Sequence, residues 1–276
     1  MYTASALQAA QAAPRKGLWW LVPREFGAWT MLATGYLTTL MVAGSVSVPA
    51  LLLIPAVAFL LMLKEPIERL LRAPAGARAQ YALFAAGELT VSSAFGLLAE
   101  RLAHAPILLL LPILALPPYT FAILLGFLPD KWRTLRELVA TTGLCLIVPG
   151  TWAALGQPPN MAMLIVYVGM VLHFLYGVGF LRLQIVASKT HMDATDVRVG
   201  TLMLAGSASM LTLLIVVLSV FGYLPIWAAV PLLPQMVRAY LWLGGEHPWL
   251  NLRHMGRQEV VLAFSLMALF TLVAHA

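Results

Sequence analysis

Long apolar segments alternate with short polar links along this chain, and that pattern constrains the fold more than any other feature. Hydrophobic residues make up 61% of the 276 residues, and charged residues only 10%. A bilayer core takes about 20 apolar residues as a helix, and backbone groups in lipid must pair within helices or a closed barrel. Continuous apolar runs favour helices, because barrel strands alternate apolar with polar residues. The sequence therefore predicts an all-α polytopic membrane protein.

About nine transmembrane helices are predicted, and the links between them are too short to form separate domains. We expect an N-terminal cytoplasmic or interfacial segment over residues 1–26 and a single transmembrane helical domain over residues 27–276. Pro112, Pro117 and Pro118 are expected to interrupt the fourth span, and Pro149 the fifth, because proline removes a backbone donor. Broken helices in the membrane would indicate a central cavity. The predicted spans are 27–44, 46–63, 81–98, 105–125, 138–155, 161–181, 201–221, 224–243 and 260–274.

Lys and Arg residues gather in every second link, which predicts how the chain is oriented. The positive-inside rule places these links in the cytoplasm, with a cytoplasmic N terminus and an outside C terminus. Links facing anionic lipid also account for the net charge of +6, so membrane lipid is the expected partner and nucleic acid is not. The cations on the cytoplasmic side are Arg15, Lys16, Arg24, Lys64, Arg69, Arg72, Arg78, Lys131, Arg133, Arg136, Arg182, Lys189, Arg198, Arg238, Arg253 and Arg257, with Arg101 opposite.

Two acidic pairs lie on the predicted cytoplasmic side. Glu65 and Glu68 follow the second span at a helical spacing of three, and Asp193 and Asp196 precede the seventh. Mg²⁺ prefers oxygen ligands and commonly bridges substrate phosphates, so the four carboxylates are candidate metal ligands. The alternative is that they form solvated ion pairs or favour a helix N terminus. Cations that could bind a diphosphate beside them include Lys131, Arg133 and Arg198.

Polar residues within or next to the spans are candidates to line a cavity. Glu88 lies within the third span, where a carboxylate needs a partner or a proton. His173 and Tyr176 lie in the sixth span, where a hydrogen-bonded packing role is the alternative to ligand binding. Arg24 and Glu25 precede the first span and either anchor it at the interface or line a polar pocket.

Several motifs resemble the UbiA superfamily of membrane prenyltransferases. The stretch 24–29, the basic Lys131–Arg133 stretch and the run from Asp193 to Leu202 are similar to its first helix, its basic loop and its second Asp motif. This resemblance implies a helix ring around a lipid-open cavity, where Mg²⁺ holds a prenyl diphosphate. The chain departs from the first Asp motif at Arg72, which stands where a third carboxylate belongs.

A second resemblance covers more of the chain. Residues 23–31 (Pro-Arg-Glu-Phe-Gly-Ala-Trp-Thr-Met), 133–138 (Arg-Thr-Leu-Arg-Glu-Leu) and 252–259 (Leu-Arg-His-Met-Gly-Arg-Gln-Glu) resemble motifs of the YwiC-like family of uncharacterised bacterial membrane proteins. This resemblance implies an architecture and a bacterial cytoplasmic (inner) membrane location rather than an activity.

Three functions follow from these observations. The first is a non-catalytic UbiA-like scaffold that binds an isoprenoid, quinone or pigment, with partner subunits in a membrane complex as a further expectation. Arg72 favours this hypothesis, because a degraded metal site removes the mechanism of transfer. The first alternative is a Mg²⁺-dependent UbiA-type prenyltransferase, and the second is a transporter.

Overall fold

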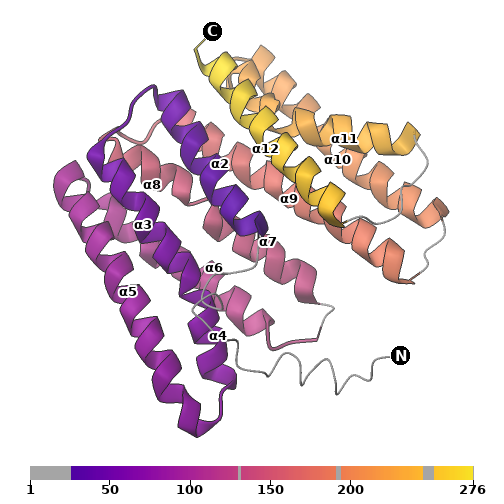
Figure 1. The fold of residues 1–276 in the computed structure, drawn as a ribbon. Helices are drawn as coiled ribbons and strands as arrows, with labels where there is room; N and C mark the ends of the chain where they lie inside the picture. The colour runs from indigo at the N-terminus through magenta and orange to yellow at the C-terminus, as the bar shows by residue number, and fades with distance from the viewer. Residues whose placement is uncertain (1–25, 130–131, 191–193, 245–251, 276) are drawn as a thin grey trace. The chain divides into compact units, whose positions relative to one another are not determined.

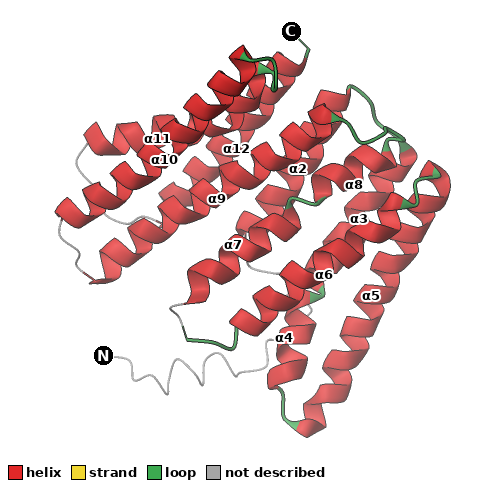
Figure 2. Cartoon of the chain, turned by 180° about the vertical axis from the view of Figure 1, so that it is seen from behind, coloured by secondary structure: helices red, strands yellow, loops and turns green. Residues whose placement is uncertain are grey.

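The structure is a computed structural model that describes residues 26–129, 132–190, 194–244 and 252–275, and every element among them is helical (Figures 1 and 2). This confirms the all-α prediction. The elements are α2 (Phe26–Ala43), α3 (Val48–Met62), α4 (Lys64–Arg72), α5 (Ala75–Ala103), α6 (Ile107–Leu125), α7 (Arg133–Leu144), α8 (Ile147–Ala154), α9 (Met161–Thr190), α10 (Ala194–Val220), the 3₁₀-helix η3 (Ile226–Leu232), α11 (Leu233–Gly244) and α12 (Leu252–Ala274).

Seven helical segments of the described chain are long and apolar enough to cross a membrane. They match seven of the predicted spans. The predicted first span corresponds to α2, which is 18 residues long. The predicted eighth span corresponds to η3 followed by the 12-residue α11. Pro231 and Pro234 lack the N–H groups that a continuous α-helix needs there, so the segment begins as a 3₁₀-helix.

Proline affects the fourth and fifth spans differently. The expected interruption of the fourth span is wrong, because α6 continues through Pro112, Pro117 and Pro118. The fifth span is broken into α7 and α8, just before Pro149. Pro149 cannot donate to the carbonyl of Cys145, and the N–H of Val148 bonds this oxygen instead at 3.0 Å. This shorter hydrogen bond is of the 3₁₀ type and ends the α-helical pattern.

The chain divides into two compact units. The first contains Pro55–Ala94, and the second contains Glu25–Ile54 and Phe95–Ala276. Helices α3 and α5 each have residues in both units. The single domain predicted over residues 27–276 and the UbiA-like ring both stay predictions.

Helix α9 is the central helix of the second unit. It packs against α2, α7, α8, α10, α11, α12 and η3. Small residues allow the closest approaches. A Cβ built on Gly169 of α9 would lie 2.4 Å from Cγ of Pro231 in η3 and 2.8 Å from Cζ of Phe270 in α12. Side chains on α9 are therefore held between the helices that follow it in the chain.

The first and last described helices pack side by side, as Figures 1 and 2 both show. Near the end of α12, His275 Nε2 lies 2.8 Å from the carbonyl oxygen of Met41 in α2. Gly35 of α2 contacts α8, and a Cβ there would lie 2.7 Å from Ile147 Cγ2. Helix α2 thus joins α8 and α12 within the second unit.

Candidate functional site

Polar side chains lie buried along one face of α9 in the second unit. His173, Gly177, Phe180 and Gln184 recur at spacings of four, three and four residues, which places them on one stripe of the helix. Helix α11 adds Gln235 and Arg238, and α12 adds Glu259. We call the side chains His173, Gln184, Gln235, Arg238 and Glu259 the polar cluster.

The imidazole of His173 is fully buried and has a protein partner at each ring nitrogen. Its Nδ1 lies 3.1 Å from the carbonyl oxygen of Pro231, and its Nε2 lies 3.4 Å from Nε2 of Gln235. A carbonyl oxygen only accepts, so Nδ1 carries the hydrogen and Nε2 accepts from the Gln235 amide. The ring also packs edge-on against Phe174 at a centroid distance of 5.2 Å. Both nitrogens are therefore occupied in packing contacts.

Arg238 and Glu259 form an ion pair between α11 and α12. Nη1 of Arg238 donates to Oε1 of Glu259, and the guanidinium carbon lies 4.2 Å from the centroid of the Phe180 ring. Only 6% of Arg238 is exposed. Gly177 leaves room for the carboxylate, because a Cβ there would lie 3.1 Å from Oε2 of Glu259. The pair is thus enclosed by α9 on one side.

Three buried donor atoms of the polar cluster have no hydrogen-bond partner. They are Nε and Nη2 of Arg238 and Nε2 of Gln184, which is 4% exposed and lies one turn beyond Phe180 on α9. Most buried polar groups are hydrogen-bonded, because leaving a donor without an acceptor costs about 1–3 kcal/mol. The N–H groups of Arg238 and Gln184 could therefore donate hydrogen bonds to an oxygen of a bound ligand.

A second ion pair joins α7 to α9 on a different face. Nε and Nη2 of Arg182 donate to the two carboxylate oxygens of Glu137. Arg133 lies 3.5 Å from the same carboxylate, but its side chain is 48% exposed against 12% for Arg182. Glu137 is thus held mainly by Arg182, in a bidentate contact that fixes both side chains.

Sequence analysis missed these two pairs. It grouped Arg182 and Arg238 with the cations of the links, whereas the structure has both within helices, α9 and α11. A carboxylate within an apolar helix needs a cationic partner, and this signal would have pointed to Glu137 and Glu259. Both carboxylates also lie in the stretches that resemble YwiC-like motifs.

The predicted metal ligands that the structure describes belong to two elements, α4 and the start of α10. Glu65 and Glu68 are half-buried on α4 in the first unit, and Glu65 pairs with Arg69 at 3.3 Å. Asp196 is exposed in the first turn of α10 in the second unit, where a carboxylate favours the helix dipole. Asp193 lies outside the described residues. Among the described residues, no three His, Cys, Asp or Glu side chains are grouped so that they could hold a metal ion.

Of the predicted diphosphate ligands, the structure describes Arg133 and Arg198, and neither is a member of the polar cluster. Arg133 begins α7 and lines a small cavity of about 90 Å³ with Arg136, Gly126 and Pro129. Arg198 is exposed on α10, and Lys131 lies outside the described residues.

Of the residues predicted to line a cavity, His173 alone belongs to the polar cluster. The hydroxyl of Tyr176 donates to Ser207 of α10 at 3.2 Å. Glu88 lies in the first unit, and Arg24 and Glu25 lie outside the described residues.

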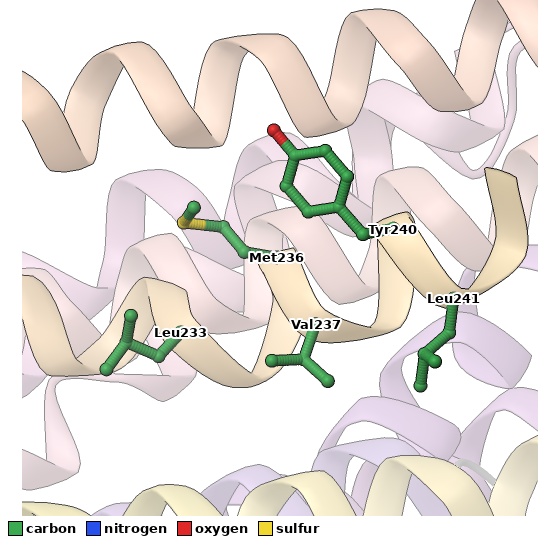
Figure 3. Close-up of a pocket in the computed structure, with 5 residues that line it drawn as sticks. All are labelled: Leu233, Met236, Val237, Tyr240 and Leu241. Atoms are coloured by element: carbon green, nitrogen blue, oxygen red, sulfur yellow. The ribbon is translucent and has the colours of Figure 1, made fainter. Parts of the chain in front are cut away.

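An apolar groove of about 390 Å³ runs along the other face of α11 (Figure 3). Tyr240 and Met236 point toward α10, where the Tyr240 hydroxyl lies 2.9 Å from Oγ of Ser209. Leu233, Val237 and Leu241 point the other way and are 40%, 59% and 70% exposed. The groove thus presents apolar side chains at the surface of the second unit.

The long apolar helices define the chain as a multi-pass, all-α membrane protein. Residues 22–151, just under half of the chain, match the model of the YwiC-like protein family. This match confirms the predicted YwiC-like resemblance over that stretch, which includes Glu137. No curated protein and no solved structure matches the chain.

Proposed function

We propose that this protein binds an isoprenoid-type ligand with a polar head group, such as a quinone or a pigment, within the bacterial cytoplasmic membrane. The observation that carries the proposal is the set of unpartnered donors on Arg238 and Gln184. A carbonyl or hydroxyl oxygen of a head group would satisfy them, and the ring of Phe180 beside the guanidinium supplies an aromatic surface. The apolar groove of α11 supports an apolar ligand independently.

The proposed orientation has the N terminus in the cytoplasm and the C terminus outside. Within the second unit, Figures 1 and 2 place the end of α9 and the starts of α10 and α12 on one side. Arg198 and Arg257 lie near these helix starts. Cations gathered at one end of a bundle favour the cytoplasmic side.

Mg²⁺-dependent prenyl transfer is the alternative. The residues at the first predicted metal-binding motif fit a metal site poorly. Glu65 is paired with Arg69, and Arg72 stands where the resembling motif has a third carboxylate. Glu65, Glu68, Asp193 and Asp196 would hold the metal in such an enzyme. We derive no metal-dependent step from them.

The test is to purify the protein in lipid nanodiscs and identify the bound isoprenoids by mass spectrometry. We expect a quinone or pigment to remain with the wild type and to be lost from Gln184→Leu, which keeps the Arg238–Glu259 pair. Arg257→Gln is the matched control, because Arg257 is exposed on α12. Equal retention in all three proteins, or no isoprenoid in any of them, would overturn the proposal.

A parallel experiment tests the alternative. Binding of a prenyl diphosphate is measured with and without Mg²⁺, for the wild type and for the double variant Asp193→Asn/Asp196→Asn. Mg²⁺-dependent binding that the double variant loses would favour the transferase. Proteins that co-purify in mild detergent would identify partner subunits of a membrane complex.

A transporter is the second candidate function, and the two partly buried ion pairs within the helices favour it. Charges within membrane helices commonly mark the path of an ion or substrate. Proton flux into proteoliposomes, followed with a pH-sensitive dye, tests this function. Flux that Glu259→Gln abolishes would support a transporter, and the absence of flux from the wild type would reject proton transport.

A further inference from the structure

Glu88 is a buried carboxyl group in the first unit, far from both ends of α5. It is the fourteenth of 29 residues in this helix, so about 20 Å of helix separates it from either end. Only 7% of Glu88 is exposed, and neither carboxylate oxygen has a hydrogen-bond partner. A 29-residue apolar helix spans a bilayer, so this position lies at the depth of the hydrocarbon core.

The face of α5 that carries Glu88 is turned toward α3. Ser92 lies one turn further along this face and donates to the carbonyl oxygen of Ala56 at 2.7 Å. Helix α3, with the sequence Val-Pro-Ala-Leu-Leu-Leu-Ile-Pro-Ala-Val-Ala-Phe-Leu-Leu-Met, contains no titratable side chain. The nearest ionisable residues of α5 on either side are Tyr81 and Glu100, two or more turns away.

Within residues 55–94 of the first unit, the remaining charged groups lie near helix ends. Lys64, Glu65, Glu68, Arg69 and Arg72 belong to α4, and Arg78 lies in the first turn of α5 and donates to the carbonyl oxygen of Ala73. None of the ion pairs found among the described residues includes Glu88. An ionised carboxylate at this place would therefore be buried with no counter-charge from the part of the chain that the structure describes.

Burying an unpaired carboxylate costs far more than burying the neutral acid, because the charge loses its hydration. We propose that Glu88 is a proton-binding site within the membrane, where the side chain is held as an exchangeable neutral acid. This inference does not depend on the ligand proposed for the polar cluster, since it uses other residues in the other unit.

A hydrophobic carbodiimide tests the inference, because it reacts with protonated carboxyl groups in apolar surroundings. The carboxyl oxygen bonds to the central carbon of the reagent, and the carboxyl proton moves to one of its nitrogens. The adduct then rearranges to a stable N-acylurea, so the peptide gains the mass of one reagent molecule. The lipid-facing neighbours of Glu88 favour access, as Leu83 and Leu89 are 74% and 51% exposed.

The full-length protein in nanodiscs is labelled, and the modified residue is identified by peptide mass spectrometry. We expect the label on Glu88 and not on Glu100 of the same helix, which pairs with Arg101 at 3.7 Å. Glu88→Gln should lose the label, and Glu88→Asp should keep it. An unlabelled Glu88 in the wild type would overturn the inference even where a variant fails to fold.

Two further measurements separate a proton from a metal cation. Protection of Glu88 by Na⁺ at constant pH would overturn the proton site in favour of a cation site. Infrared difference spectra between the wild type and Glu88→Gln should contain the carbonyl band of a protonated carboxyl, and this band should shift in D₂O. A carboxylate band in its place would also overturn the inference.

Discussion

Replacing Glu259 by Gln should destabilise the protein more than any single change at an exposed ion pair. The change removes the carboxylate charge and leaves Arg238 buried, with only 6% of the residue exposed. Breaking a buried ion pair by removing one partner typically costs 3–5 kcal/mol. The Glu259 side chain keeps 26% of its surface exposed, so we take the lower end and expect a loss of about 3 kcal/mol in the free energy of unfolding.

The converse change should cost less. In Arg238→Met the remaining carboxyl of Glu259 can take up a proton and become neutral, whereas a guanidinium cannot lose its charge. The variant also loses the cation–π contact with Phe180, which contributes about 0.5–2 kcal/mol. The structure therefore predicts that Arg238→Met lowers the free energy of unfolding less than Glu259→Gln does.

Unfolding in mixed micelles titrated with sodium dodecyl sulfate, followed by tryptophan fluorescence, measures both effects. Glu65→Gln is the matched control, since Glu65 pairs with Arg69 within one helix and both side chains are about a third exposed. That control should lose about 0–0.5 kcal/mol. The reasoning is refuted if Glu259→Gln costs no more than the control, or if Arg238→Met costs more than Glu259→Gln.

Two further predictions use the same assay. Gly177→Ala should be less favourable than Gly206→Ala by about 1–3 kcal/mol, because a Cβ on Gly177 would lie 3.1 Å from the Glu259 carboxylate, whereas a Cβ on Gly206 would meet no atom within 4 Å. Arg182→Gln should destabilise by several times more than Arg133→Gln, because Arg182 is the more buried and makes two contacts to the shared carboxylate. Equal losses within either pair would contradict the packing described above.

Apolar run length predicted where the helices lie, but it could not predict how prolines act within them. Helix α6 continues through three prolines, whereas one proline breaks the fifth span. A Cβ on Gly143 of α7 would lie 3.3 Å from Pro118, so α7 packs closely against the proline-bearing stretch of α6. Such contacts between helices are not visible in the local sequence.

The candidate site was harder to predict than the fold, because its partners are distant in the sequence. Glu259 meets Arg238 across 21 residues, and Glu137 meets Arg182 across 45. The positive-inside rule assigns Arg and Lys residues to links. It therefore gave no sign that Arg182 and Arg238 lie within helices and form ion pairs there. His173 was found because a lone histidine in an apolar helix is conspicuous, but its partners Gln235 and Pro231 were not.

The contact between α2 and α12 has a consequence for biogenesis. Helix α12 is synthesised more than 200 residues after α2, and His275 contacts Met41 across 234 positions. Until α12 enters the membrane, the face of α2 that it covers must meet lipid or an insertion factor. A nascent chain stalled before residue 252 would therefore hold α2 without this neighbour.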